Sequence, residues 1–253
     1  MNALLSIYAW VALAVVAIVG FFGQLSVFAL TAPFDRRRYW AGRYLRRLGV
    51  VIARVSPFWH FEVHGAVPTQ IAGNTVCVGN HESHADPFLV SHLPWEMKWL
   101  GKASLFRIPF LGWMMRLAGD VPVHRGQQDS ARGAMAQCAV WLERGCPVMI
   151  FPEGTRSQTE ELLPFKDGAF RLAIQSQAQV LPLAVSGTRR ALPKHSWRFE
   201  KAQARVAVGT PLSTVGMTLD DVPLLKEQAR AQIVALRTEL QRTLEVPAHS
   251  PMR

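Results

Sequence analysis

After residue 57, short apolar runs alternate with longer segments of helical periodicity. The short runs predict strands at residues 59–63, 75–78, 97–100, 121–124, 148–151, 180–185 and 204–208. The longer segments predict helices at residues 87–92, 105–117, 129–143, 166–177 and 219–244. Strands that alternate with helices are typical of α/β domains. We therefore expect an α/β fold with a largely parallel mixed sheet flanked by helices.

The first segment is apolar over a longer stretch. Residues 3–30 carry no charged side chain, and Ser6, Gln24 and Ser26 are its clearly polar positions. About 20 apolar residues can span a bilayer. A signal peptide usually begins with Lys or Arg, and residues 1–30 contain neither. We expect an N-terminal membrane-anchoring helix, spanning or re-entrant. The alternative is a buried helix of a soluble core, which is rarely uncharged over such a length.

Positive charge follows this segment, in a stretch that predicts a basic juxtamembrane helix. Its arginines are Arg36, Arg37, Arg38, Arg43, Arg46, Arg47 and Arg54. By the positive-inside rule this flank and the domain after it face the cytoplasm. The aromatic residues among the arginines suit contact with anionic head groups.

Overall charge and cysteine content narrow the choice of partners and compartment. The formal charge of +10 and the pI of about 10.3 favour an anionic partner: acidic lipid, a phosphorylated substrate or nucleic acid. Nucleic acid is disfavoured because no recognisable binding motif accompanies the basic segment. The three cysteines show no disulfide or zinc spacing, which suits a reducing compartment.

The chain divides into three parts. Residues 1–57 form the membrane-associated helices, residues 58–245 one catalytic or binding domain, and residues 246–253 a flexible tail. We find no internal repeat, low-complexity tract or Gly/Ser linker that would argue for a second domain.

The stretch VGNHESHADPF, residues 78–88, carries the most chemistry. In one interpretation Asp86 only caps the helix that begins with Pro87. In a second, His81, His84 and Asp86 are metal ligands. In a third, Asp86 orients one nitrogen of His81 and leaves the other free to accept a proton. The stretch alone leaves all three open.

Other polar groups follow the predicted strands. FPEGTRS, residues 151–157, offers a carboxylate, a flexible glycine, hydroxyls and a guanidinium, and GDVPVHR ends in His124 and Arg125. VLPLAVSGT, residues 180–188, is an apolar strand followed by a turn. Each by itself reads as a surface loop or a buried strand. Ligands of open α/β sheets gather beyond the carboxyl ends of strands, so the two loops after residues 78 and 151 are expected to meet.

The order of these motifs is more specific than any one of them. N-H-x-x-x-x-D, G-x-x-P-x-x-R, F-P-E-G-T-R-S and V-x-P follow each other between Asn80 and Thr188. This order resembles the glycerolipid acyltransferase family, in particular bacterial 1-acyl-glycerol-3-phosphate acyltransferases. IPFLGW, residues 108–113, resembles the linker between the family's first two motifs. An acidic residue expected after Lys102 is replaced by Ala103-Ser104-Leu105, a departure that concerns the acceptor more than the reaction.

The resemblance implies residue roles. His81 matches the general base and Asp86 its partner, and Pro182 matches the fourth motif. The substrate-binding set that it implies is Arg125, Glu153, Gly154, Thr155 and Arg156. Family members need no metal and no bound cofactor, since acyl-CoA or acyl-carrier protein is a co-substrate. His84 matches a variable position outside the chemistry.

The implied activity is transfer of a fatty acyl group to the sn-2 hydroxyl of 1-acyl-glycerol-3-phosphate. The product is phosphatidic acid, and the expected location is the inner (cytoplasmic) membrane. The chemistry agrees, because a thioester is already activated and one His–Asp pair suffices to deprotonate the attacking hydroxyl. The alternatives are another lysophospholipid or lyso-aminolipid as acceptor, a metal-dependent hydrolase, and a non-catalytic lipid-binding membrane protein. A serine lipase is disfavoured because the chain lacks G-x-S-x-G.

Overall fold

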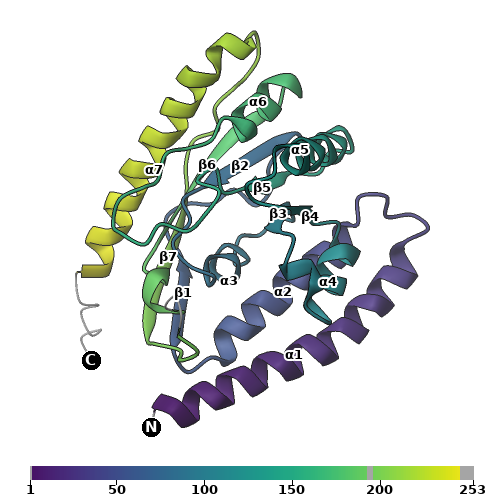
Figure 1. Cartoon of the computed structure of the whole chain (residues 1–253), viewed down its shortest axis with the longest axis vertical. Helices are drawn as coiled ribbons and strands as arrows, with labels where there is room; N and C mark the ends of the chain where they lie inside the picture. The colour runs from purple at the N-terminus through teal and green to yellow at the C-terminus, as the bar shows by residue number, and fades with distance from the viewer. Residues whose placement is uncertain (1, 193–195, 246–253) are drawn as a thin grey trace.

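A computed structural model of the chain describes residues 2–192 and 196–245 as a sheet with helices on both faces (Figure 1). The predicted tail, residues 246–253, lies outside the described residues. The strands are β1 (Trp59–Val63), β2 (Thr75–Gly79), β3 (Lys98–Lys102), β4 (Val121–Val123), β5 (Val148–Ile150), β6 (Gln179–Ser186) and β7 (Ala202–Val208). Each predicted strand is present, and no strand end differs from its prediction by more than two residues.

The sheet has the order β1-β7-β6-β2-β5-β3-β4. Neighbouring strands are parallel except for β6 and β7, which are antiparallel. The prediction of a largely parallel mixed sheet is confirmed. Because β1 and β7 run opposite to the other strands, the start of β1 lies at the edge where β2, β5 and β6 end.

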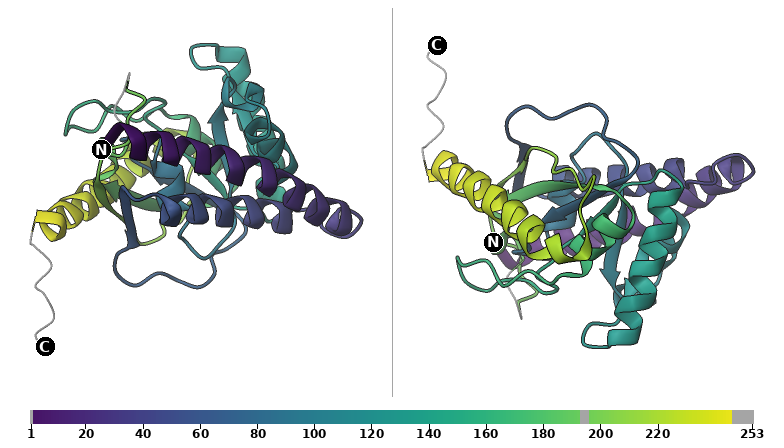
Figure 2. Two further views of the ribbon diagram at one scale, coloured as in Figure 1. Left: turned by 90° about the horizontal axis from the view of Figure 1, so that it is seen from below. Right: turned by 90° about the horizontal axis from the view of Figure 1, so that it is seen from above.

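Helices cover both faces of the sheet (Figures 1 and 2). They are α1 (Asn2–Thr31), α2 (Tyr39–Val55), α3 (Asp86–Val90), α4 (Leu111–Ala118), α5 (Gln128–Glu143), α6 (Gly168–Gln175) and α7 (Val222–Glu245). Single 3₁₀ turns occur at η1 (Leu105–Arg107), η2 (Thr188–Arg190) and η3 (Leu219–Asp221). Helices α5, α6 and α7 cover one face, and α3 covers the other, with α2, α4 and α1 beyond it.

The central strand β2 shows why this sheet needs two helical layers. All five of its residues are buried. Val76 and Val78 pack into the apolar cluster on the α5–α7 face, and Cys77 packs into the cluster on the α3 face. Successive side chains of a strand point to opposite faces, so a continuous apolar run is stable only where both faces are covered.

The predicted helix over residues 105–117 is wrong in its first half. The chain makes the turn η1, becomes extended at Ile108 (ψ 124°), and begins α4 only at Leu111. Pro109 explains the break, because a proline lacks an N–H and pushes the preceding residue out of the helical region. Phe110 takes a positive φ of 61° where the chain turns into α4.

Helices α1 and α2 form an antiparallel hairpin that lies along the domain (Figure 2). Near the start of α1, the indole Nε1 of Trp10 donates to the carbonyl of Trp197 at 2.7 Å. Near its end, the buried amide of Gln24 donates to the carbonyls of Ala41 in α2 and Met114 in α4. Helix α1 is therefore docked on the domain at both ends.

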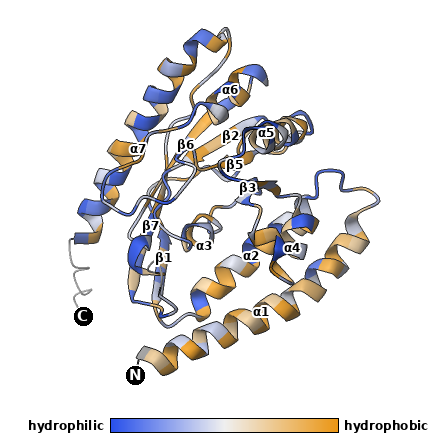
Figure 3. Ribbon diagram, in the orientation of Figure 1, coloured by the Kyte–Doolittle hydropathy of each residue, from blue (hydrophilic) through white to orange (hydrophobic). Residues whose placement is uncertain are grey.

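The outer face of α1 is apolar and exposed (Figure 3). More than half of the side-chain surface is accessible at several large apolar positions, among them Leu4, Val11, Val19, Phe22 and Leu30. Residues 3–31 have the length and hydropathy of a membrane span, and little of that stretch is buried within the protein. The alternative of a buried core helix is therefore wrong.

The basic helix α2 uses its arginines in two ways. Arg46 is buried and pairs with Asp120, and the guanidinium of Arg43 donates to the carbonyl of Leu93 at 2.9 Å. Arg47 and Arg54 are exposed. Arg43 and Arg46, two of the arginines in the segment expected to contact lipid, therefore attach α2 to the domain.

Candidate active site

The sequence motifs converge at the carboxyl edge of the sheet. His81 follows β2, Glu153 follows β5, and Thr188 follows β6. These three strands are parallel neighbours, so their ends lie side by side. The backbone N–H of His81 donates to Oε1 of Glu153 at 2.7 Å. The structure thus joins the two loops that the strand pattern predicted to meet.

A histidine–aspartate pair lies at the centre of this edge. Nδ1 of His81 is 2.6 Å from Oδ2 of Asp86, and both side chains are buried. With the carboxylate ionised, Nδ1 carries the proton, so Nε2 is the nitrogen that can accept another. The relay interpretation matches this geometry.

Asp86 is held by the loop that precedes it. Its Oδ2 also accepts the backbone N–H groups of Glu82 at 2.8 Å and Ser83 at 3.0 Å, and its Oδ1 accepts the hydroxyl of Thr188. The expectation that Asp86 caps α3 is wrong. The N-cap residue is Ala85, without a side-chain cap, because the carboxylate points back to the loop and to the imidazole.

Ring stacking and hydrogen bonding together fix the imidazole of His81. It stacks on Phe151 with ring centroids 4.3 Å apart and an angle of 13° between the planes. The carbonyl of His81 accepts the N–H of Ser157 at 2.8 Å. Ring orientation is therefore set by packing and by the backbone together, as a general base requires.

Glu153 bridges two loops. Its Oε1 accepts the N–H of His81 and its Oε2 accepts the N–H of Leu163 at 3.0 Å. Burial raises the pKa of Glu153, and the two backbone donors partly oppose that rise. Both carboxylate oxygens are engaged with backbone, so this geometry fits a role in site architecture more than direct contact with an acceptor.

The other predicted residues supply charge beside the pair. Burial lowers the pKa of Arg125, and the neighbouring charge of Arg156 lowers it further. Burial also lowers the pKa of Arg156, while nearby Asp86 opposes that shift. The charge of Arg156 therefore acts on Arg125 and is itself influenced by Asp86. Thr155 is exposed, and Gly154 takes a positive φ of 70°, which favours glycine.

His84 faces the same charges. Partial desolvation, followed by the charges of Arg156, His81 and Arg125, lowers the pKa of His84 to about 4. Its ring is therefore neutral near pH 7. Over residues 2–192 and 196–245, no three His, Cys, Asp or Glu side chains group as metal ligands would. The geometry gives no support to a site built on His81, His84 and Asp86.

Sequence reasoning missed three residues of this site. The side-chain amide of Asn80 exchanges two hydrogen bonds of 2.9 Å with the backbone of Val185, which fixes the end of β2 against β6. Thr188 binds Asp86, and Phe151 stacks on His81. Each stands at the carboxyl end of a predicted strand, and that position was the available signal.

Comparison with known proteins identifies a matching family and several similar proteins. Residues 60–186 match the acyltransferase family. The 1-acyl-sn-glycerol-3-phosphate acyltransferase BAT2 of Brassica napus is 32% identical over 203 residues, which are 79% of this chain and 57% of that protein. The 1-acyl-sn-glycerol-3-phosphate acyltransferase alpha of Mus musculus is 32% identical over 222 residues, which are 85% of this chain and 77% of that protein.

A solved structure shares the fold. The 1-acyl-sn-glycerophosphate acyltransferase PlsC from Thermotoga maritima matches with a TM-score of 0.74 over 98% of both chains, at 22% identity. The chain spans little more than half the length of the Brassica napus relative. The family match covers half of the chain and includes the motif residues from His81 to Pro182. On these grounds the chain belongs to the acyltransferase family.

Proposed function

We propose that this protein transfers a fatty acyl group to the sn-2 hydroxyl of 1-acyl-glycerol-3-phosphate, giving phosphatidic acid. The acyl donor is acyl-CoA or acyl-carrier protein, and no resident cofactor is needed. The observation that carries this proposal is the buried His81–Asp86 pair, with Nδ1 and Oδ2 2.6 Å apart. Relatives named as 1-acyl-sn-glycerol-3-phosphate acyltransferases support the choice of acceptor.

The pair performs the reaction without a protein nucleophile. Nε2 of His81 takes the proton of the acceptor hydroxyl, and the oxygen attacks the thioester carbonyl carbon. The C–S bond then breaks, and the imidazolium returns the proton to the thiolate, so that an ester and a free thiol leave. Asp86 stabilises the imidazolium and keeps its proton on Nδ1.

The arginines beside the pair bind the phosphate of the acceptor. Arg125 and Arg156 are close enough for the charge of Arg156 to lower the pKa of Arg125, an arrangement that an anion between them relieves. Guanidinium groups bind phosphate through paired hydrogen bonds. The acceptor's hydroxyl then lies beside His81 while its phosphate is held at the loops after β4 and β5.

Helix α1 lies along the membrane surface with its exposed face in the lipid. A helix docked on the domain at Trp10 and at Gln24 cannot leave it to cross a bilayer without breaking these contacts. The exposed apolar surface includes Trp113, whose ring lies beside that of Phe21 of α1. The exposed arginines of α2 suit contact with anionic head groups and support a location at the cytoplasmic face of an inner membrane.

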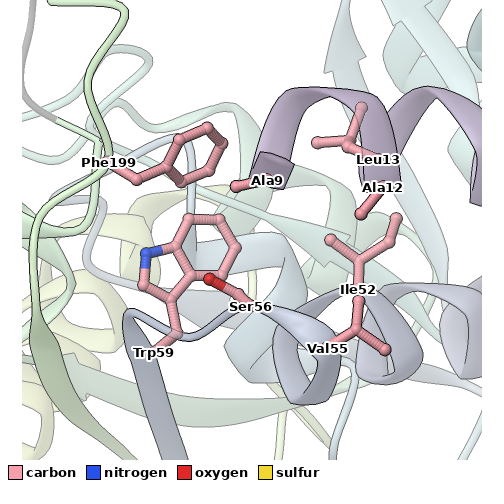
Figure 4. Close-up of a pocket in the computed structure, with 8 residues that line it drawn as sticks. All are labelled: Ala9, Ala12, Leu13, Ile52, Val55, Ser56, Trp59 and Phe199. Carbon is pink, nitrogen blue, oxygen red and sulfur yellow. The ribbon is translucent and has the colours of Figure 1, made fainter. Parts of the chain in front are cut away.

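The loop that carries His81 and Asp86, which we call the catalytic loop, packs against the α1–α2 hairpin. Ala85 belongs to the same apolar cluster as Ala9 of α1 and Ala53 of α2. Beside this cluster, a small crevice opens between the two helices, where Trp59 and Phe199 face Ala9 (Figure 4). The catalytic loop therefore packs against the membrane-associated helices, which supports a lipid as acceptor.

The test is a radiolabelled acyl-transfer assay on membranes that contain this protein. It offers acyl-CoA or acyl-carrier protein with a panel of lysolipids, with and without EDTA, beside the variant His81→Ala. We expect transfer to lysophosphatidic acid that survives EDTA and is lost in the variant. Removing a general base typically costs about 10²–10⁴-fold in rate.

The other functions give different outcomes in the same assay. Preferential transfer to another lysophospholipid or a lyso-aminolipid changes the acceptor and keeps the chemistry. Release of free fatty acid that EDTA blocks indicates a metal-dependent hydrolase, and lysolipid binding without turnover indicates a lipid-binding protein. Near-normal turnover by His81→Ala refutes the relay.

A further inference from the structure

We propose that Arg237 of α7 is a positioning residue for the catalytic loop and acts through Glu82. The inference rests on the proposed acyl transfer, because its main readout is the rate of that reaction. Helix α7 is the long helix on the outside of the sheet in Figure 1, far in sequence from the motifs. Its side chains nevertheless reach the loop that carries His81 and Asp86.

Arg237 stands at a position where an apolar residue is expected. The buried side of α7 includes Leu225, Ala229, Ile233 and Leu240, and Arg237 follows Ile233 on this stripe at the spacing of one turn. An arginine buried here must be matched by opposite charge, since an unpaired buried ion is costly. A function separate from packing the sheet explains its presence.

The partner of Arg237 is the residue next to His81. Its Nε lies 3.0 Å from Oε1 of Glu82, and both side chains are almost fully buried. The backbone N–H of Glu82 donates to Oδ2 of Asp86 at 2.8 Å. Glu82 is thus held by its side chain to α7 and by its backbone to the acid of the catalytic pair.

Arg237 also holds the loop that follows the third motif. Its Nη2 lies 2.9 Å from Oε2 of Glu160, and Nη1 donates to the carbonyl of the same residue. That loop begins with Glu153, which accepts the N–H of His81. One guanidinium therefore connects two loops, and each of them makes a hydrogen bond to the pair.

A second arginine completes the network from the loop after β6. Arg189 lies 3.1 Å from Glu160 and 3.7 Å from Glu82. Its neighbour Thr188 donates to Asp86. Loss of Arg237 leaves Glu82 buried, with this longer contact as its remaining ion pair among the described residues. Whether the carboxylate then moves toward solvent or takes up a proton, the loop loses its ion pair with α7, and the backbone N–H bound to Asp86 is no longer held in place.

This mechanism predicts an effect on turnover rather than on acceptor affinity. Displacements of about 1 Å in a catalytic site cost up to roughly 10²-fold in rate. We expect Arg237→Met to lower kcat about tenfold to a hundredfold and to change KM by less than about threefold. Arg237→Lys keeps the charge and should recover part of kcat.

The decisive variant removes both partners. In the double variant Arg237→Met with Glu82→Gln, no buried charge is left unpaired, so kcat should rise at least about fivefold above that of Arg237→Met alone. Glu82→Gln alone should lower kcat by less than Arg237→Met does, because its amide oxygen still accepts from Arg237. A merely structural role of Arg237 would lower the free energy of unfolding and leave kcat of the folded variant unchanged.

The experiment measures kcat, KM and thermal unfolding for these variants in vesicles that contain lysophosphatidic acid. The matched control is Arg242→Met, since Arg242 is an exposed arginine of the same helix. Should Arg237→Met fail to fold, the double variant and Arg237→Lys carry the comparison. A kcat of Arg237→Met equal to that of Arg242→Met overturns the inference, as does a double variant no faster than Arg237→Met. Absence of transfer by the wild type overturns the proposed function instead.

Discussion

Replacing Asp86 by asparagine separates the charge of the catalytic pair from its geometry. Oδ2 of Asp86 accepts from Nδ1 of His81 and from the N–H groups of Glu82 and Ser83, and Oδ1 accepts from Thr188. The amide oxygen of asparagine can keep the first three hydrogen bonds. Its NH₂ can donate to the hydroxyl of Thr188, which rotates to accept. The loop is therefore expected to keep its shape and to lose one negative charge.

The magnitude follows from the 2.6 Å contact between imidazole and carboxylate. A hydrogen bond to a charged group typically contributes about 1.5–3 kcal/mol, and here the charge of the carboxylate stabilises the imidazolium. At about 1.4 kcal/mol for each factor of ten, we expect kcat of Asp86→Asn to fall about 10–10²-fold. Because two backbone hydrogen bonds lose their charge assistance, the free energy of unfolding should fall by about 1–3 kcal/mol.

Acyl transfer and thermal unfolding should be measured together, with Thr188→Val as the comparison. That variant keeps the carboxylate charge and removes one buried donor, so it should lose stability by about 1–3 kcal/mol and keep kcat within about tenfold. If folded Asp86→Asn turned over within threefold of the wild type, the charge of Asp86 would have no part in catalysis. An equal loss in both variants would show that geometry, rather than charge, limits the rate.

Two further predictions concern charged neighbours of the pair. Arg125→Ala should raise KM for lysophosphatidic acid about tenfold with a smaller change in kcat, and an unchanged KM would remove Arg125 from the phosphate site. Burial, followed by the nearby charge of Asp86, raises the pKa of Glu82 to about 7, against the opposing charges of Arg237 and Arg189. The folded state then holds the proton of Glu82 more tightly than the unfolded state does, so protonation of Glu82 favours folding. This contribution to the free energy of unfolding is complete below about pH 4.5 and is lost as pH rises through 7. The free energy of unfolding should be measured against pH for Glu82→Gln and for the wild type. We expect the variant to lack this decline of roughly 3 kcal/mol, and parallel curves for the two proteins would contradict the raised pKa of Glu82.

The success of the strand predictions has a local cause. Strands such as β2 and β6 are buried on both faces, so their apolar runs stand out from the flanking polar loops. The failure over residues 105–117 is also local, because the apolar spacing there concealed the effect of Pro109. The role of Asp86 as a helix cap failed for another reason, since its carboxylate had a better set of donors in its own loop.

The sequence by itself determined the candidate residues of the proposed active site. The order of the motifs, and their position after predicted strands, indicated His81, Asp86 and the two arginines, because the carboxyl ends of parallel strands share one edge. The long uncharged segment and the arginines after it indicated a membrane-associated helix. Whether that helix spans a membrane or lies along the domain depends on its contacts with residues far away in the chain.

Tertiary structure alone decided how the pair is held. Thr188 is 102 residues from Asp86 in the chain, and Arg237 is 155 residues from Glu82. The sequence places Arg237 on the apolar side of an amphipathic helix. It does not show the oppositely charged side chain with which folding pairs this arginine. Hydrophobic periodicity records which face of an element is buried. It does not show which polar group of another element that face will contact, and in this protein such polar contacts fix the geometry of the proposed active site.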